Sequence, residues 1–364
     1  MVSDRGQIVQ SFSSLSDALG SLEPIETILV TRKTGLAALK NETLIESLRI
    51  VIAPEGEPKL SDILDFEVKS LKGVTRIVSL GGGSVIDFSK GLAVMAEFPE
   101  LRSKMLESSR SSYSVGSAAS IIEHVVIPTR AGSGSEASSS AIFRDGSRKI
   151  PIYGPSLIPS RIFWVPSLLS TDFKSNLSGM LDMVGHAFES LLSTKADSIL
   201  DVTALDTMQL AIEFGKKTEL GSWDNLRLLR ASAQAGLCQD VRLVSLPHAL
   251  AHSLSNDLAH GLMVGNFLKQ FIKGLREADK NLFSYLEELF ERQGISIPSL
   301  LEVLEEWVRE ANVISGVDTF EKVTLEEAQT AIEDPAARLT KTSVNEDSFG
   351  LYDFQRPVRQ GRNG

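Results

Sequence analysis

The sequence predicts an α/β half followed by an all-α half. Short β-branched segments alternate with segments of helical spacing through the first half, the order expected of a parallel sheet covered by helices. Beyond about residue 170, apolar residues recur at helical spacing and strand signals stop. We therefore predict a Rossmann-like dinucleotide-binding domain over residues 1–167 and an all-α metal-binding and catalytic domain over 168–364.

Each predicted strand of the first half is short, apolar and mostly β-branched. These strands cover residues 26–31, 49–53, 75–80, 123–128, 141–143, 149–153 and 161–165. The helices predicted between them cover 35–48, 60–71 and 81–98. Residues 106–120 are rich in serine and predict a surface loop.

In the second half, apolar residues recur every three to four positions, which is typical of amphipathic helices. The predicted helices cover residues 182–193, 203–217, 225–237, 281–293, 300–312 and 324–334. The tail, 351–364, is polar and is expected to fray.

Composition narrows the classes of function. The 364 residues carry a net charge of −10, which argues against a nucleic-acid partner, since such proteins normally show a basic footprint. The single cysteine, Cys238, excludes a disulfide within the chain and favours a reducing compartment. No signal peptide and no apolar run of about 18 residues is evident, so we expect a cytoplasmic protein without a membrane partner.

Two glycine-rich turns follow predicted strands. LGGGSVIDFSK (80–90) opens a helix, where glycines let the backbone approach a ligand and free N–H groups suit a phosphate. Gly82 and Gly83 supply that backbone, and Ser84 adds a hydroxyl donor. IPTRAGSGSEAS (127–138) is a second such turn. Either turn alone could be a tight connection without a ligand, but two in one sheet predict a nucleotide-binding edge.

Arg32 follows the first clear strand of this half. An acidic residue at a strand end often binds the ribose hydroxyl of NAD, whereas an arginine accommodates the 2′-phosphate of NADP. Arg32 therefore favours NADP(H) over NAD(H). The alternative is a solvated basic turn.

Four of the five histidines lie in two segments of the second half. His248 and His252 are four residues apart, which places them on one helix face, and His260 follows shortly after. Asp182 and His186 form a second such pair. Imidazole and carboxylate donors suit Fe²⁺, Zn²⁺ or a related divalent ion. The alternatives are hydrogen-bonded core histidines or a Ser/His/Asp hydrolase, which lacks its G-x-S-x-G elbow here.

Together these motifs resemble the iron-containing (group III) alcohol dehydrogenase family over roughly residues 20–330. The resemblance rests on GGGSVIDFSK, IPTRAGSGSE, Asp182-x3-His186, and His248-x3-His252 followed by His260-Gly261. It implies a homodimer and a metal-dependent enzyme, with Fe²⁺ favoured over Zn²⁺.

The resemblance also implies roles for individual residues. The metal ligands it implies are Asp182, His186, His248 and His260, with His252 near the nicotinamide as a proton relay. The cofactor contacts it implies, besides Gly82, Gly83 and Ser84 at the pyrophosphate, are Asp87, Thr129, Ser133 and Lys149. Arg130 stands where the family usually has threonine, and DMVGHAFES replaces the usual DALTHAIEA. These departures leave the substrate open.

The predicted activity is metal-assisted hydride transfer between NAD(P)H and a small aldehyde or ketone. A polyol-, sugar- or phosphonate-derived carbonyl compound is a plausible substrate. Three alternatives stay open: a dehydroquinate-synthase-like lyase or cyclase that uses NAD transiently, a metal-free reductase of the maleylacetate type, and a non-catalytic nucleotide sensor.

Overall fold

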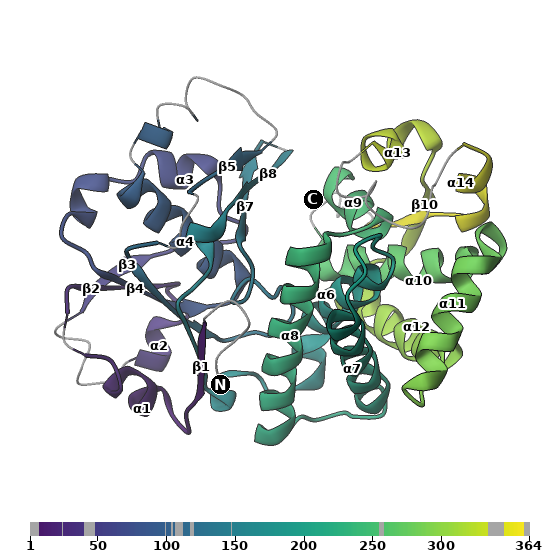
Figure 1. Cartoon of the computed structure of the whole chain (residues 1–364), viewed down its shortest axis with the longest axis horizontal. Coiled ribbons are helices and arrows are strands. Elements are labelled where there is room, and N and C mark those ends of the chain that lie inside the picture. The colour runs from purple at the N-terminus through teal and green to yellow at the C-terminus, as the bar shows by residue number, and fades with distance from the viewer. Residues whose placement is uncertain are drawn as a thin grey trace. The chain divides into compact units, whose positions relative to one another are not determined.

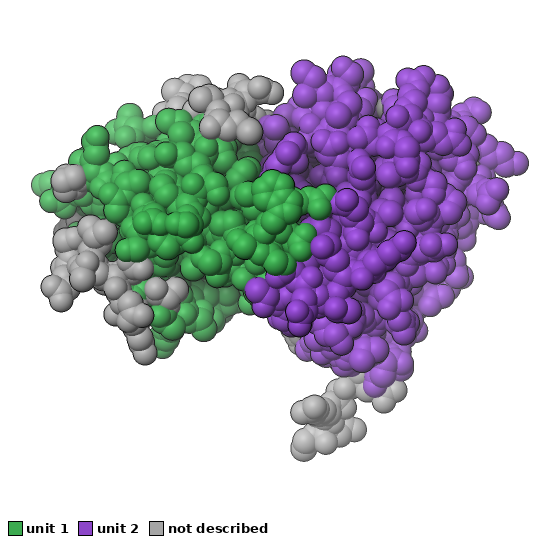
Figure 2. Space-filling view, turned by 90° about the horizontal axis from the view of Figure 1, so that it is seen from below, with its two compact units in different colours: residues 1–170, 221–229 green, residues 171–220, 230–364 purple. Residues whose placement is uncertain are grey.

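The chain divides into two compact units (Figure 2). The computed structural model describes residues 7–23, 25–39, 48–98, 100–102, 105, 112–116, 120–146, 148–254, 258–333 and 346–359. The first unit comprises Met1–Ser170 and Gly221–Leu229, and the second comprises Thr171–Leu220 and Arg230–Gly364. The sequence predicts one boundary after residue 167. In the structure residues 221–229, from later in the chain, also belong to the first unit.

A six-stranded parallel sheet forms the centre of the first unit (Figure 1). In spatial order its strands are β1 (Ile8–Ser11), β9 (Arg161–Trp164), β6 (Glu123–Pro128), β4 (Arg76–Gly81), β2 (Thr27–Thr31) and β3 (Arg49–Ile52). The predicted parallel α/β fold is confirmed. Strand β1 was not predicted, because its four residues IVQS alternate weakly and its formation depends on pairing with the distant β9.

A smaller three-stranded sheet lies in the same unit. It consists of β5 (Tyr113–Ser114), β8 (Arg148–Tyr153) and β7 (Ser140–Asp145), with β7 and β8 antiparallel. Strands β7 and β8 correspond to the predicted segments 141–143 and 149–153. The predicted serine-rich loop lies mostly outside the described residues, at 106–111 and 117–119.

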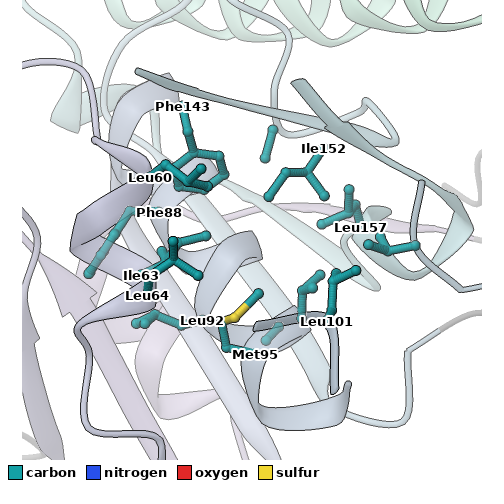
Figure 3. Packing of buried hydrophobic residues seen from close by; sticks show 14 of the residues in the cluster. Leu60, Ile63, Leu64, Phe88, Leu92, Met95, Leu101, Phe143, Ile152 and Leu157 are labelled. Carbon is teal, nitrogen blue, oxygen red and sulfur yellow. The ribbon is translucent and has the colours of Figure 1, made fainter. Parts of the chain in front are cut away.

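The helices of the first unit include α1 (Leu15–Gly20), α2 (Leu36–Leu39), α3 (Leu60–Leu64), α4 (Gly83–Glu97) and the beginning of α8 (Ser222–Arg242). Most of the predicted helix 35–48 lies outside the described residues, and the predicted helix 60–71 is α3 followed by a 3-10 turn at Val68–Leu71. Helix α4 packs its buried face against α3 and β7, as Figure 3 shows for Phe88, Leu92, Ile63 and Phe143. A Cβ on Gly91 would lie 2.6 Å from the Phe143 ring, so this glycine allows the close packing.

The second unit is mostly helical (Figure 1). Its helices are α6 (Phe173–Leu191), α7 (Ser198–Phe214), the end of α8 (Ser222–Arg242), α9 (Leu246–Ser253), α10 (His260–Ala278), α11 (Lys280–Arg292), α12 (Ile297–Ile314), α13 (Leu325–Ile332) and α14 (Glu346–Tyr352). Helix α10 was not predicted as an element of its own, although it packs along α6.

Two short strands correct the all-α prediction for this half. β10 (Thr319–Lys322) pairs antiparallel with β11 (Gln355–Val358). The expectation that the tail from residue 351 frays is therefore wrong up to Val358, because backbone hydrogen bonds and a hydrogen bond from the Gln355 amide to Gln270 Oε1 fix it. Both strands are polar and short, so no apolar alternation marked them in the sequence. Among the described helices, none is both long and apolar enough to cross a membrane.

Candidate metal centre and nucleotide-binding edge

One face of α6 carries Asp182, His186 and Glu189, at steps of four and three residues. Helical geometry places such residues above one another. The helix is 19 residues long and begins where the Asp172 side chain accepts hydrogen bonds from the Lys174 and Ser175 amides. All three residues of this face are buried.

Helices α9 and α10 bring the other histidines to this face. His248 and His252 lie on α9, whereas His260 is the first residue of α10. The polar break at 255–257 between them lies outside the described residues. The His248 side chain is buried, and that of His260 is 23% exposed, so the cluster opens to solvent on the α10 side.

Glycines set how closely these helices approach. A Cβ on Gly185 would lie 2.8 Å from Cε1 of His248, and a Cβ on Gly261 would lie 3.0 Å from the Asp182 Cβ. Larger residues at either position would push the donor-bearing helices apart. The Gly185 of DMVGHAFES, one of the departures from the family pattern, thus lies directly against a candidate ligand.

Asp182, His248 and His260 offer ligand atoms that all lie within 4.8 Å of one another. The Asp182 Oδ1 atom lies 3.3 Å from His248 Nε2 and 3.6 Å from His260 Nε2. Two imidazole nitrogens and one carboxylate oxygen around one point suit a divalent ion such as Fe²⁺ or Zn²⁺. The residues present therefore fit a metal site.

His186 and His252 lie beside these three donors, and each ring is nearly parallel to the ring of one candidate ligand. The His186 ring stacks on His248 with centroids 4.4 Å apart, and the His252 ring stacks on His260 at 4.9 Å. The sequence had placed His186 among the ligands and His252 in a different role. The structure brings both histidines to the cluster.

Glu189 is a further residue of the site that was not predicted from the sequence. Its carboxylate accepts a hydrogen bond of 2.6 Å from Nδ1 of His248 and one of 2.5 Å from the Ser245 amide. Burial by itself lowers the pKa of His248, but the Glu189 and Asp182 carboxylates outweigh it and raise that pKa to about 9. The signal was available, because Glu189 lies three residues after His186 on the same helix face.

In the first unit, the two glycine-rich turns follow neighbouring strands. Strand β4 ends at Gly81, which is in register with Pro128 at the end of β6. On its other side β4 pairs with β2, which leads into Arg32. The chain leaves β2 toward β3 and leaves β4 toward β6, so the strand order reverses between β2 and β4. Ligands of open α/β sheets bind at such a point, outside the carboxyl ends of the strands.

The two turns contact each other. The Thr129 amide donates to the Gly81 carbonyl at 3.1 Å, and a Cβ on Gly83 would lie 2.5 Å from Ser133 Oγ. Gly134 has a φ of 63°, which only glycine adopts readily. Helix α4 starts after Gly82, and no side chain of the described residues caps it. The backbone at Gly82, Gly83 and Ser84 therefore has the form of a phosphate-binding turn.

Asp87 and Lys90 of α4 form hydrogen bonds that stabilise the second glycine-rich turn, residues 127–138, and the start of β7. Asp87 accepts hydrogen bonds from Ser135 Oγ at 2.5 Å and from the Ile142 amide at 3.1 Å. Burial raises the pKa of Asp87, although nearby Lys90 opposes this. Lys90 is fully buried and donates to the carbonyls of residues 135, 138 and 140 at 2.7–2.8 Å. These contacts hold Asp87 against the 129–139 loop and the start of β7.

Two other predicted cofactor residues have protein partners. Arg32 donates through Nε to the Pro54 carbonyl at 3.1 Å and through Nη2 to the Gly56 carbonyl. Burial and the charge of Arg130 lower the pKa of Arg32, so the two arginines are electrostatic neighbours. Lys149 on β8 lies 3.3 Å from Glu57 Oε1.

Comparison with known proteins agrees with these motifs. Residues 9–166 match the model of the family described as iron-containing alcohol dehydrogenase. The chain is 25% identical over 223 residues to aldehyde-alcohol dehydrogenase 2 of Entamoeba histolytica, which is 58% of this chain and 26% of that protein. It is also 25% identical over 217 residues to the NAD-dependent methanol dehydrogenase of Bacillus methanolicus, 58% of this chain and 55% of the relative. The chain spans about a quarter of the length of the first of these curated relatives.

Solved structures extend the likeness to the whole chain. The iron-containing alcohol dehydrogenase of Thermococcus thioreducens superposes with a TM-score of 0.75 at 20% identity, covering 95% of this chain and 97% of the other. The fold is thus that of an α/β unit followed by a helical unit of the iron-containing alcohol dehydrogenase type. The resemblance predicted from the sequence is confirmed, since residues 9–166 match the model of this family and the fold is similar over 95% of the chain.

Proposed function

We propose that the chain is a metal- and NAD(P)-dependent alcohol dehydrogenase that interconverts small alcohols with aldehydes or ketones. The observation that supports this most is the group of Asp182, His248 and His260, whose ligand atoms lie within 4.8 Å of one another. The names of the matched relatives, alcohol and aldehyde-alcohol dehydrogenases, point to the same reaction class.

The proposed ligands are Asp182, His248, His260 and, as the fourth, His186, whose ring lies against that of His248. When bound, a divalent ion supplies a Lewis acid that polarises a carbonyl or acidifies the corresponding alcohol. The Asp182 carboxylate offsets the ion's charge in a buried place. Fe²⁺ is the proposed ion and Zn²⁺ the alternative, since nitrogen and oxygen donors accept either.

His252 is the proposed proton relay. Its ring stacks on His260 and is only partly buried, so it can exchange a proton with solvent while lying next to a ligand. Imidazole is the usual group for proton transfer near neutral pH.

The proposed cofactor is NADP(H) in preference to NAD(H). Gly82, Gly83 and Ser84 would bind its pyrophosphate, with Thr129 and Ser133 on the adjacent turn. Arg32, held beside Arg130 at the end of β2, would bind the 2′-phosphate. Asp87 and Lys149 complete the proposed cofactor contacts. A small carbonyl compound of polyol, sugar or phosphonate origin is the proposed substrate.

Two single substitutions test the roles. His260→Ala should lose both bound metal and activity, because it removes a ligand. His252→Ala should retain the metal and lose roughly 10²- to 10⁴-fold in kcat, because it removes only proton transfer. Metal content by elemental analysis and NADPH-linked reduction of an aldehyde and ketone panel, on protein reconstituted anaerobically with Fe²⁺ or Zn²⁺, give the two readouts.

His124→Gln is the matched control. His124 is a buried histidine of β6 in the first unit, so its replacement should leave metal content and rate unchanged. Complete metal loss in His252→Ala would contradict the assigned roles. Turnover without net change in nicotinamide absorbance would instead indicate a lyase or cyclase that uses the cofactor transiently.

A further inference from the structure

The Glu189 side chain lies inside the second unit with both of its oxygens used. Oε2 accepts from the Ser245 backbone amide at 2.5 Å, and Oε1 lies 2.6 Å from Nδ1 of His248. The side chain is fully buried. An ionised carboxylate has only acceptor positions, so both groups facing it must be donors.

When Nε2 of His248 serves as a metal ligand and carries no proton, this pair of contacts places the one remaining proton of the ring on Nδ1. The Ser245 backbone amide can only donate, so it occupies Oε2. The other oxygen, Oε1, then accepts a hydrogen bond from the protonated Nδ1 of His248. The opposite nitrogen, Nε2, faces Asp182 Oδ1 at 3.3 Å and is the atom that lies within the donor group of three residues. A neutral imidazole binds a metal only through its unprotonated nitrogen.

We propose that Glu189 is a positioning residue for the metal site: it holds the proton of His248 on Nδ1 and so presents Nε2 as a ready metal ligand. The inference rests on the proposed metal centre. Carboxylates that accept the second N–H of a ligating histidine orient the ring and increase its basicity. Among the described candidate ligands, Glu189 contacts only His248, so its effect on a metal passes through this ring.

The substitution Glu189→Gln separates this role from simple packing. A glutamine has one acceptor oxygen and one donor NH₂ group, yet it faces two donors. If its oxygen accepts from Ser245, its NH₂ group faces Nδ1 of His248. That arrangement is satisfied when the His248 proton moves to Nε2, where it can donate to Asp182. The variant therefore keeps its buried hydrogen bonds while the ligand nitrogen becomes blocked.

We expect Glu189→Gln to bind Zn²⁺ 10- to 100-fold more weakly than the unchanged chain, measured by competition with a chelator. Far-UV circular dichroism of the metal-free proteins should be the same for both, so that the loss of affinity is not a loss of fold. Glu189→Asp keeps two acceptor oxygens on a shorter side chain, so its affinity should lie between the two. This partial recovery would not occur if only side-chain volume mattered.

Glu123→Gln is the matched control in the first unit. It makes the same chemical change in a carboxylate that pairs with Arg76 at 2.6 Å and with Arg161 at 3.5 Å. It should lower the unfolding temperature and leave Zn²⁺ affinity unchanged. An affinity of Glu189→Gln within twofold of the unchanged chain, or a Glu189→Asp affinity below that of Glu189→Gln, would overturn the inference. Absence of Zn²⁺ and Fe²⁺ binding by the unchanged chain would instead overturn the proposed metal centre.

Discussion

Gly261 lies so close to Ser178 that a Cβ on the glycine would be 1.8 Å from the Ser178 carbonyl oxygen. The carbonyl belongs to the backbone of α6 and cannot move without shifting that helix. The first turn of α10, which carries His260, therefore approaches α6 at a distance that only glycine permits.

Gly261→Ala should destabilise the protein by at least 1–3 kcal/mol, the usual cost of overpacking, and should weaken metal binding by displacing His260 from Asp182. Urea unfolding and Zn²⁺ competition measure the two effects. Gly350→Ala is the control, since a Cβ there would meet nothing within 4 Å in α14. It should stabilise by about 0.5–1 kcal/mol, because alanine is the better helix former. If Gly261→Ala and Gly350→Ala had the same free energy of unfolding and the same Zn²⁺ affinity, the close approach of α10 to α6 would matter neither for stability nor for metal binding.

Lys90→Met should strongly destabilise the first unit. The substitution removes the Lys90 donor from three carbonyls, two of them in buried contacts, and removes the positive charge that opposes the raised pKa of Asp87. Breaking a buried charged contact typically costs about 3–5 kcal/mol. The 129–139 loop should become more mobile, so the Kd for NADPH should rise as well.

Lys72→Met, at an exposed position, is the comparison for Lys90→Met. It should change the free energy of unfolding by less than about 0.5 kcal/mol. Denaturant titration and cofactor fluorescence provide the measurements. A Lys90→Met protein with unchanged stability would contradict the assigned role of this buried ammonium group.

His124 should make the stability of the protein depend on pH. Burial, and secondarily the charge of Lys90, lower the pKa of His124 to about 3, while its Nε2 lies 2.6 Å from Ser79 Oγ. Between about pH 3 and 6.5 the unfolded state binds a proton at this residue and the folded state does not, so stability falls as the pH drops below 6.5.

The measurement is the free energy of unfolding at pH 7.5 and 5.5. For the unchanged chain, His124 should contribute a loss of about 1.4 kcal/mol over this interval. His124→Gln removes that contribution, so its loss should be smaller by the same amount, since all other groups titrate equally in both proteins. Identical losses would show that folding does not lower the pKa of His124.

Arg32→Ala should weaken NADPH binding and leave NADH binding unchanged. A hydrogen bond to a charged group contributes about 1.5–3 kcal/mol, which corresponds to roughly 10- to 100-fold in Kd. Arg49→Ala removes the same charge from the start of β3, at the amino-terminal end of the strands, whereas Arg32 follows the carboxyl end of β2. The ratio of KM values for the two cofactors checks the prediction. A parallel loss of NADH affinity would assign Arg32 to a different part of the cofactor.

The local pattern of the sequence was sufficient for most strands of the first unit. β6 has the predicted bounds, 123–128, and β2, β3, β4 and β9 differ from prediction by one or two residues. These strands are rich in apolar and β-branched residues, and all but β3 have a buried centre, so their composition distinguishes them from helices. β1, β10 and β11 carry no such pattern, since they are short and depend on partners far away in the chain.

The sequence by itself determined which residue types form the site and which turns require glycine. Helical spacing and backbone sterics act between near neighbours, so both can be predicted from local sequence. Only the tertiary structure decided that Glu189 lies between His248 and Ser245, and that Asp87 and Lys90 hold the loop after β6. Those contacts depend on which helix faces meet, and that is set by packing between segments distant in sequence, as at Gly185 and Gly261.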